Sequence, residues 1–266
     1  MEEQVFRDMI QEELSRMDPE LHWGAGEEPW SGVYGYVERY ALEKRLRNTA
    51  LALPLVRKMV FCTGGLEDSF FEDCTAQLWH CLSICRILID LHISLTRREE
   101  DILLAAALCH VLPKSSRLGT GIGRGLDPEV VELLNLIRRE DFLDTEKRML
   151  FVNRVQGNRL ALLLRAADQG HFVEQLHKFS GWRTRQYIFE TRNIYMPLCI
   201  YGKEHYPELA APMSILMEKM RCLVEVAEIL LSRYEVRENE LTMEIFALRE
   251  ENARIRELIQ RMKKEI

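Results

Sequence analysis

Apolar residues near the C-terminus repeat at a spacing that restricts the possible folds more than any other feature of the chain. From residue 241 onward the intervals alternate between four and three residues, which is the heptad pattern of a coiled-coil helix. The d positions hold Leu241, Leu248, Ile255 and Met262, and the a positions hold Ile245, Asn252, Ile259 and Ile266. A stripe of this kind needs a second helix to cover it, so it predicts one long helix that pairs.

The residues of the seam favour two parallel strands. β-Branched residues at a and leucine-type residues at d are typical of parallel dimers, and a single asparagine at an a position fixes the register. Asn252 is that asparagine. In a parallel dimer Glu244 faces Arg249 of the other strand, and Glu251 faces Arg256, so both pairs attract.

We therefore expect a parallel homodimer through residues 241–266, at the end of a long helix that begins near Pro212. The first part of that helix carries apolar residues suited to packing on a preceding domain, namely Ile215, Leu216, Met220, Leu223, Val224, Ala227 and Leu231. The alternative is a helix that folds back on its own domain. That arrangement seldom requires an asparagine within the seam or matched charges beside it.

Apolar residues recur at helical spacing through the rest of the chain, and no alternating strand pattern persists. We expect an all-α protein with an N-terminal helix and loop (1–33), a multi-helix domain (34–211) and the C-terminal helix (212–266). Helices are predicted over 1–17, 34–60, 76–93, 97–112, 127–139, 145–154, 158–177 and 182–201, with loops or connections at 18–33 and 62–74. Pro54 should end or kink the second helix, and Asp127 followed by proline should start the fifth.

The composition describes a globular protein with one large domain and an appendage, since 47% of the 266 residues are hydrophobic. A net charge of −6 argues against nucleic-acid binding, which needs a basic surface. No signal peptide and no membrane-length apolar run is visible, so we expect a cytoplasmic protein that does not contact a membrane.

Seven cysteines are present, without a Cys-x-x-Cys pair. Five of them lie in apolar helical segments: Cys81, Cys85, Cys109, Cys199 and Cys222. We expect buried, reduced thiols rather than a zinc ribbon or a redox motif.

Three polar residues stand within apolar helical runs and are candidates to converge in the folded protein. They are His80, His110 and Asp168. Two imidazoles and one carboxylate on separate helices suit a divalent cation with open coordination positions. The alternative is that each histidine is a hydrogen-bonded core residue without a metal.

The order of these residues resembles that of the HD-domain phosphohydrolases, over roughly residues 40–206. His80, then His110 at the end of an apolar helix, then Ala167-Asp168 follow the order of that family. The segment Glu190-Thr191-Arg192-Asn193-Ile194-Tyr195-Met196-Pro197-Leu198 is similar to the one that follows the metal-binding helices in alarmone hydrolases of the Rel/SpoT type.

This resemblance implies a helical HD-type domain that holds one manganese ion and removes pyrophosphate from the 3′ position of guanosine tetra- or pentaphosphate, (p)ppGpp. His80 matches the first histidine ligand, His110 matches the histidine of the His-Asp doublet, and Asp168 matches the last aspartate ligand. The chain after Pro207 is helical and then heptadic, so no alarmone synthetase domain is expected.

Departures from the family pattern predict a degenerate site. Val111 replaces the aspartate of the doublet, and Leu112-Pro113-Lys114-Ser115 lacks the acidic pair that positions water in the family. After Asp168 the run is Gln169-Gly170-His171-Phe172, which keeps the family's histidine and loses its asparagine. His171 lies one helical turn after Asp168 and is a candidate fourth donor. An imidazole in place of a carboxylate shifts preference from manganese toward zinc, nickel or iron.

Two further features are candidates to contact phosphate. Arg154, Arg159 and Arg165 lie on or just before the helix that carries Asp168, and guanidinium groups bind phosphate through paired hydrogen bonds. Residues 113–126 form a glycine-rich, basic segment whose amides suit an anion-binding nest. The alternatives are solvated or structural arginines and a mobile surface loop.

Together these observations predict a degenerate (p)ppGpp-hydrolase-like HD-domain protein that acts as a dimeric nucleotide-binding or regulatory module without efficient hydrolysis. No cofactor is expected, although a bound metal would be a divalent cation such as manganese, zinc or iron. The expected small-molecule partner is a phosphorylated guanine nucleotide. The first alternative is an active metal-dependent pyrophosphohydrolase, and the second is a structural protein-interaction module.

Overall fold

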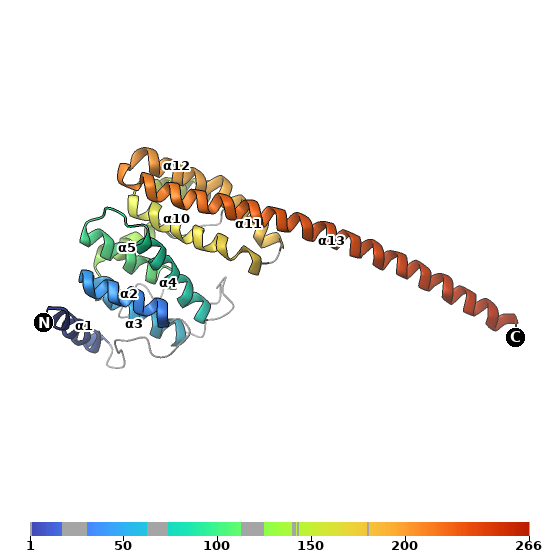
Figure 1. Ribbon diagram of the computed structural model, residues 1–266, viewed down its shortest axis with the longest axis horizontal. Coiled ribbons are helices and arrows are strands. Elements are labelled where there is room, and N and C mark those ends of the chain that lie inside the picture. The colour runs from blue at the N-terminus through green and yellow to red at the C-terminus, as the bar shows by residue number, and fades with distance from the viewer. Residues whose placement is uncertain are drawn as a thin grey trace.

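The computed structural model of the chain describes residues 2–17, 31–62, 74–112, 125–139, 142, 144–179 and 181–265. Across these ranges the regular structure is entirely helical, which confirms the all-α prediction (Figure 1). Most helices gather into one domain, and the last helix projects away from it. Among the described helices, none is both long enough and apolar enough to cross a bilayer.

The helices follow the chain in the order α1 (Glu2–Met17), α2 (Ser31–Lys44), α3 (Arg47–Cys62), α4 (Cys74–Asp90), α5 (Arg97–Cys109), α8 (Pro128–Leu136), α9 (Thr145–Gln156), α10 (Arg159–Glu174), α11 (Gly181–Glu190), α12 (Met196–His205) and α13 (Ala210–Glu265). The later helices are joined by two 3-10 turns and one π-helical turn, which are η1 (Leu176–Lys178), η3 (Pro207–Leu209) and η2 (Thr191–Tyr195). The predicted loop over 18–33 and the connection over 62–74 lie mostly outside the described residues, as does most of the glycine-rich segment 113–126.

Helix α10 is the centre of the domain. Its residues from 160 to 173 are all buried, because α4, α5, α9, α12 and α13 pack around it. A helix buried on all its faces needs an apolar sequence, and the run Leu160-Ala161-Leu162-Leu163-Leu164 provides it. The polar residues that follow in α10 must therefore be held by partners inside the protein.

The single helix predicted over 34–60 is two helices, α2 and α3, so this prediction was wrong. α2 ends where Arg45 adopts a left-handed backbone, with φ 55°. The Leu46 amide donates to the Ala41 carbonyl at 2.8 Å, and the Arg45 amide donates to the Leu42 carbonyl at 3.1 Å. These bonds form a Schellman cap. Glycine usually takes the left-handed position of this motif, so an arginine there gave no stop signal in the sequence.

A carboxylate from a different helix caps the start of α3. Asp101 of α5 is buried, and its Oδ2 accepts hydrogen bonds from the backbone N and from Nδ2 of Asn48, both at 2.9 Å. Its Oδ1 accepts from the backbone N and Oγ1 of Thr49, at 2.8 and 2.9 Å. Asn48 Oδ1 in turn accepts from the amide of Asp127, the residue that caps α8 as predicted. Asp101 therefore satisfies free N–H groups at a helix start and fastens α3 to α5.

Pro54 and Pro197 are each preceded by more than one turn of helix. Pro54 was predicted to end or kink its helix; it lies inside α3, which continues past it to Cys62, so the predicted end was wrong. Pro197 lies at the start of α12, directly after η2. A proline ring lacks an N–H and clashes with the carbonyl one turn earlier. The wider turn of η2 accommodates that clash within the stretch predicted as one helix over 182–201.

Helix α13 is a single helix of 56 residues. Its first part packs on α10 and α12, and its second part extends beyond the domain (Figure 1). The observed start at Ala210 agrees with the predicted start near Pro212. Within the described residues α13 does not turn back on the domain, so the fold-back alternative is wrong.

Of the five cysteines whose side chains the structure describes, four are buried, as predicted. Cys81, Cys85, Cys109 and Cys199 lie in the core, and burial raises the pKa of Cys199 to about 12. Cys222 is exposed, which contradicts the prediction, because at this level only one face of α13 contacts the domain.

The Asp101 cap gives a test of the packing between α3 and α5. We expect Asp101→Asn to lower the free energy of unfolding by about 3 kcal/mol, because the new amide group would face N–H donors that then lose their acceptor. Urea unfolding followed by circular dichroism measures this change. Glu132→Gln makes the same chemical change at an exposed carboxylate and should cost less than about 0.5 kcal/mol. Equal stability of the two variants would refute the capping role.

Candidate metal centre

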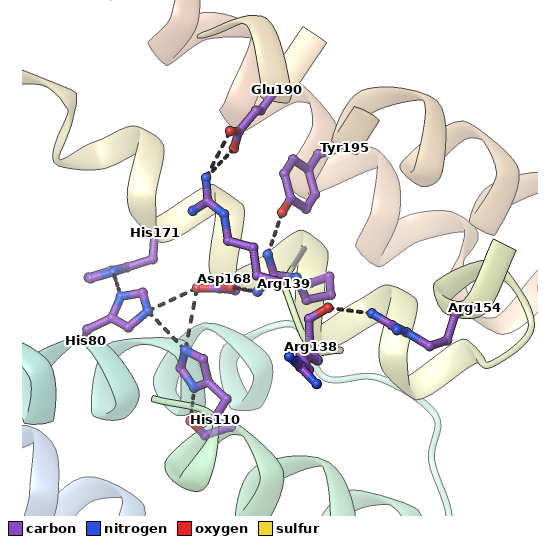
Figure 2. Close-up of polar contacts among 11 residues, drawn as sticks. His80, His110, Arg138, Arg139, Arg154, Asp168, His171, Glu190 and Tyr195 are labelled. Atoms are coloured by element: carbon purple, nitrogen blue, oxygen red, sulfur yellow. Dashed lines mark hydrogen bonds and ion pairs between the residues drawn. The ribbon is translucent and has the colours of Figure 1, made fainter. Parts of the chain in front are cut away.

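Three separate helices bring His80, His110 and Asp168 together in a group that we call the His/Asp cluster (Figure 2). His80 belongs to α4, His110 caps the C-terminal end of α5, and Asp168 belongs to α10. Oδ1 of Asp168 lies 3.0 Å from Nε2 of His80 and 3.6 Å from Nε2 of His110. The two Nε2 atoms are 3.2 Å apart. The predicted convergence is therefore observed, and the cluster could hold a metal ion.

The cluster forms because each polar residue lies in an apolar helical run that must be buried. Leu78, Cys81 and Leu82 draw α4 into the core, and the apolar second half of α5 does the same for His110. His80 and Asp168 are fully buried, whereas the side chain of His110 keeps 9% of its surface exposed. His110 is thus the member of the cluster closest to solvent.

The proton on His110 can be assigned from its backbone partner. Nδ1 of His110 lies 2.7 Å from the carbonyl oxygen of Ala107. A carbonyl only accepts, so Nδ1 carries the proton and donates it. Nε2 of the neutral ring then directs its lone pair at the cluster, which is the state that binds a metal.

His171 lies behind His80 rather than inside the cluster (Figure 2). Its Nδ1 is 2.7 Å from Nδ1 of His80, on the opposite side of that ring from Asp168. The structure thus places this candidate fourth donor against a ligand and away from the point where the other three atoms meet. Its other nitrogen, Nε2, is 3.0 Å from Nε2 of Gln175.

The contact between His80 and His171 leaves two arrangements of protons, because one of the two Nδ1 atoms must donate. If His80 donates, then both Nε2 atoms and Oδ1 of Asp168 present lone pairs to one another, and a cation between them is favourable. If His171 donates, the proton of His80 moves to Nε2 and takes the place of that cation. The amide Nε2 of Gln175 donates to Nε2 of His171 at 3.0 Å, which puts the His171 proton on Nδ1. This contact favours the second arrangement when no cation is bound, with the proton on Nε2 of His80 facing Oδ1 of Asp168 at 3.0 Å.

The ionisation states also suit a metal. Burial lowers the pKa of His80 to about 4 and that of His171 to about 3. Burial by itself would raise the pKa of Asp168, but Arg165 and the two imidazoles outweigh it and hold that pKa well below its usual range. At neutral pH Asp168 is therefore a carboxylate and His80 a neutral imidazole, the forms that coordinate divalent cations.

Arg165 fixes the orientation of Asp168 from outside the cluster. Its Nη1 donates to Oδ2 of Asp168, and its Nη2 donates to the hydroxyl of Tyr195. The guanidinium lies 5.5 Å from the ring centroids of both Phe151 and Tyr195. This buried arginine, proposed from the sequence as a phosphate contact, is thus engaged as a partner of the aspartate.

The other two candidate phosphate contacts are also engaged within the protein. Arg154 donates to the backbone carbonyls of Leu136 and Arg138 (Figure 2). Arg159 forms ion pairs with Glu99 and Glu208. The glycine-rich segment proposed as an anion nest lies, up to residue 124, outside the described residues.

A second ion pair, between the partly buried Arg139 and the buried Glu190, was not predicted from the sequence. Both carboxylate oxygens of Glu190 accept from Nη2 of Arg139 at 2.9 Å (Figure 2). The guanidinium lies 5.4 Å from the rings of Phe142 and Tyr187. The only signal was that Glu190 begins the segment that resembles alarmone hydrolases.

That segment encloses the polar part of α10. Oγ1 of Thr191 accepts from Nε2 of Gln169 at 2.8 Å, and Tyr195 contacts Arg165.

Val111 is half-buried and packs against the core, where it offers no ligand atom. No protein-family model matches the chain, and neither a curated protein nor a solved structure matches it.

The low histidine pKa values predict a pH-dependent loss of stability in metal-free protein. A histidine whose pKa is about 3 when folded and 6.5 when unfolded takes up its proton on unfolding, so stability falls as pH falls below 6.5. Between pH 7 and pH 5 this loss is about 2 kcal/mol for one such histidine. We expect His171→Gln to remove about that much of the loss, measured as unfolding free energies at the two pH values.

The exposed His177 is the control for this measurement, because His177→Gln should leave the pH dependence unchanged. If His171→Gln lost as much stability on acidification as the wild type, the neutral, buried state of His171 would be disproved.

Proposed function

We propose that this chain is an HD-type metal-binding protein, a degenerate relative of the (p)ppGpp hydrolases that binds a phosphorylated guanine nucleotide without hydrolysing it efficiently. The observation that supports the proposal most directly is the His/Asp cluster, in which ligand atoms from three helices meet and His80 and Asp168 have the ionisation states that a metal requires. The order of those ligands and the segment around Glu190 support the family resemblance.

The ion would sit between Nε2 of His80, Nε2 of His110 and Oδ1 of Asp168. A divalent cation there would supply a Lewis acid for a phosphoryl oxygen. Arg165 would hold the aspartate in place, and Ala107 would keep the His110 ring in its ligating tautomer. The nucleotide would reach the ion from the side of His110, because this side chain is partly exposed.

Inefficient hydrolysis follows from the residues around His110. Val111 removes one carboxylate ligand, and the following Leu112 is an apolar core residue. Water activation at a metal needs an oriented ligand set and a general base, and the sequence 111–115 contains no carboxylate for either role. The protein then acts as a regulatory module whose nucleotide-bound and free states differ in stability.

An active pyrophosphohydrolase is the second candidate. Three protein ligands with an open position also describe a catalytic zinc site, and the His/Asp cluster has that number. The third candidate, a structural interaction module, needs neither metal nor nucleotide.

Metal content tests the proposed centre. We expect purified protein dialysed against manganese, zinc or iron to retain about one divalent ion per chain, because the cluster supplies one set of ligands. His110→Ala should abolish this, as measured by elemental analysis, whereas His177→Ala should not. Val111→Asp should raise manganese affinity by restoring a carboxylate, and Val111→Asn should not. Retention of metal by His110→Ala would place the ion elsewhere.

Nucleotide binding distinguishes the three candidates. With metal present, we expect guanosine tetraphosphate at about 100 times its Kd to raise the Tm by about 5 °C, because ligand binding stabilises only the folded state. Guanosine, which lacks the phosphates, should have no effect. Pyrophosphate release at a steady rate would favour the enzyme, and an unchanged Tm would favour the structural module.

A further inference from the structure

The heptad phase of the C-terminal seam begins inside the domain and continues without a break to the end of α13. Counting back from Leu241 in steps of seven gives d positions at Tyr234, Ala227, Met220 and Met213. Met213, Met220 and Ala227 are buried against the domain. Tyr234 is exposed, and Leu241 has 43% of its surface exposed. One face of α13 therefore changes from covered to exposed where the domain ends.

The a positions show the same change. Val224 is fully buried, and Leu231 packs against the core near the start of α11, since a Cβ added to Gly181 would lie 4.0 Å from its Cδ2. Two heptads later, Ile245 has 51% of its surface exposed. The domain's own helices cannot reach this level, because α13 has already left them (Figure 1). An apolar stripe of this length calls for another helix.

We infer that a second copy of this chain covers the stripe, parallel and in register from Leu241 onward. Charge decides the direction. The e positions of the seam are mostly basic and the g positions are mostly acidic: Arg249, Arg256 and Lys263 at e, and Glu244, Glu251 and Glu265 at g. A parallel pair sets g against e of the partner, so opposite charges meet. An antiparallel pair sets g against g and e against e, so like charges meet.

Glu238 fixes where the pairing begins. It occupies the a position between Leu231 and Ile245. In a parallel pair, two copies of this carboxylate would face each other in the seam, which is unfavourable. The helices therefore meet at Leu241 and diverge toward their domains, which gives each domain room beside its own α13. Pairing over residues 241–265 spans about 37 Å of helix and sets both His/Asp clusters at the same end of the dimer.

The oligomeric state of the full-length chain tests this interface, independently of the metal centre. Sedimentation equilibrium should give twice the chain mass for the wild type and a single chain mass for the double variant Leu241→Asp/Ile245→Asp. Met243→Asp is the matched control, since Met243 is apolar, 70% exposed and at an f position off the seam. It should remain a dimer. A monomeric wild type, or a seam variant that stays dimeric while its domain is folded by circular dichroism, would overturn the inference.

Disulfide trapping tests the direction. The parent for this test is Cys222→Ser, which removes the one exposed thiol among the five cysteines whose side chains the structure describes. In that parent, Ile245→Cys should form an interchain disulfide rapidly under mild oxidation, because equivalent a positions face each other in a parallel, in-register pair. Met243→Cys and the parent itself should not form that bond. A dimer in which Ile245→Cys forms no more disulfide than Met243→Cys would overturn the parallel register.

Discussion

The buried ion pair between Arg165 and Asp168 is the interaction on which the centre of this protein depends. Both residues lie on α10, the helix that the rest of the domain packs around. A buried charge without its partner costs several kcal/mol, so the packing around α10 is compatible with only one arrangement of these side chains. The aromatic rings of Phe151 and Tyr195 fix the guanidinium, and the guanidinium fixes the carboxylate. The position of one potential ligand is thus set by the core itself.

For the two histidines of the cluster, the hydrogen-bond partner of Nδ1 decides which ring nitrogen carries the proton. The carbonyl of Ala107 only accepts, so a neutral His110 has a single tautomer. Nδ1 of His80 contacts Nδ1 of another histidine, which can donate or accept, so His80 can adopt either of two tautomers. One ligand is therefore preset, and the other can exchange a proton for a cation. In such an arrangement a cation that binds to the cluster competes with the proton on Nε2 of His80.

Sequence patterns were sufficient to predict the features that depend on residues close together in the chain. Apolar periodicity predicted the helices, and polar residues inside apolar runs predicted the cluster of His80, His110 and Asp168. The failures concern interactions between distant segments. Nothing local to Arg45 announces a left-handed cap, and nothing local to α3 indicates that Asp101 caps it. His171 was correctly predicted to lie near the cluster, but it contacts the side of His80 that faces away from Asp168. Helical spacing predicts which face of a helix a residue occupies, and it does not predict which atom its side chain contacts. The pairing of Arg139 with Glu190 joins residues 51 positions apart.

The uninterrupted course of α13 has a mechanical consequence. Its first turns form part of the cover over α10, where Gly202 of α12 allows the side chain of Met213 to approach closely. Its last turns lie far outside the domain. A continuous helix is stiff, and a close-packed interior transmits strain rather than absorbing it. A sideways force on the part of α13 outside the domain is therefore transmitted, as by a lever, to the side chains that cover α10, the helix that carries Asp168.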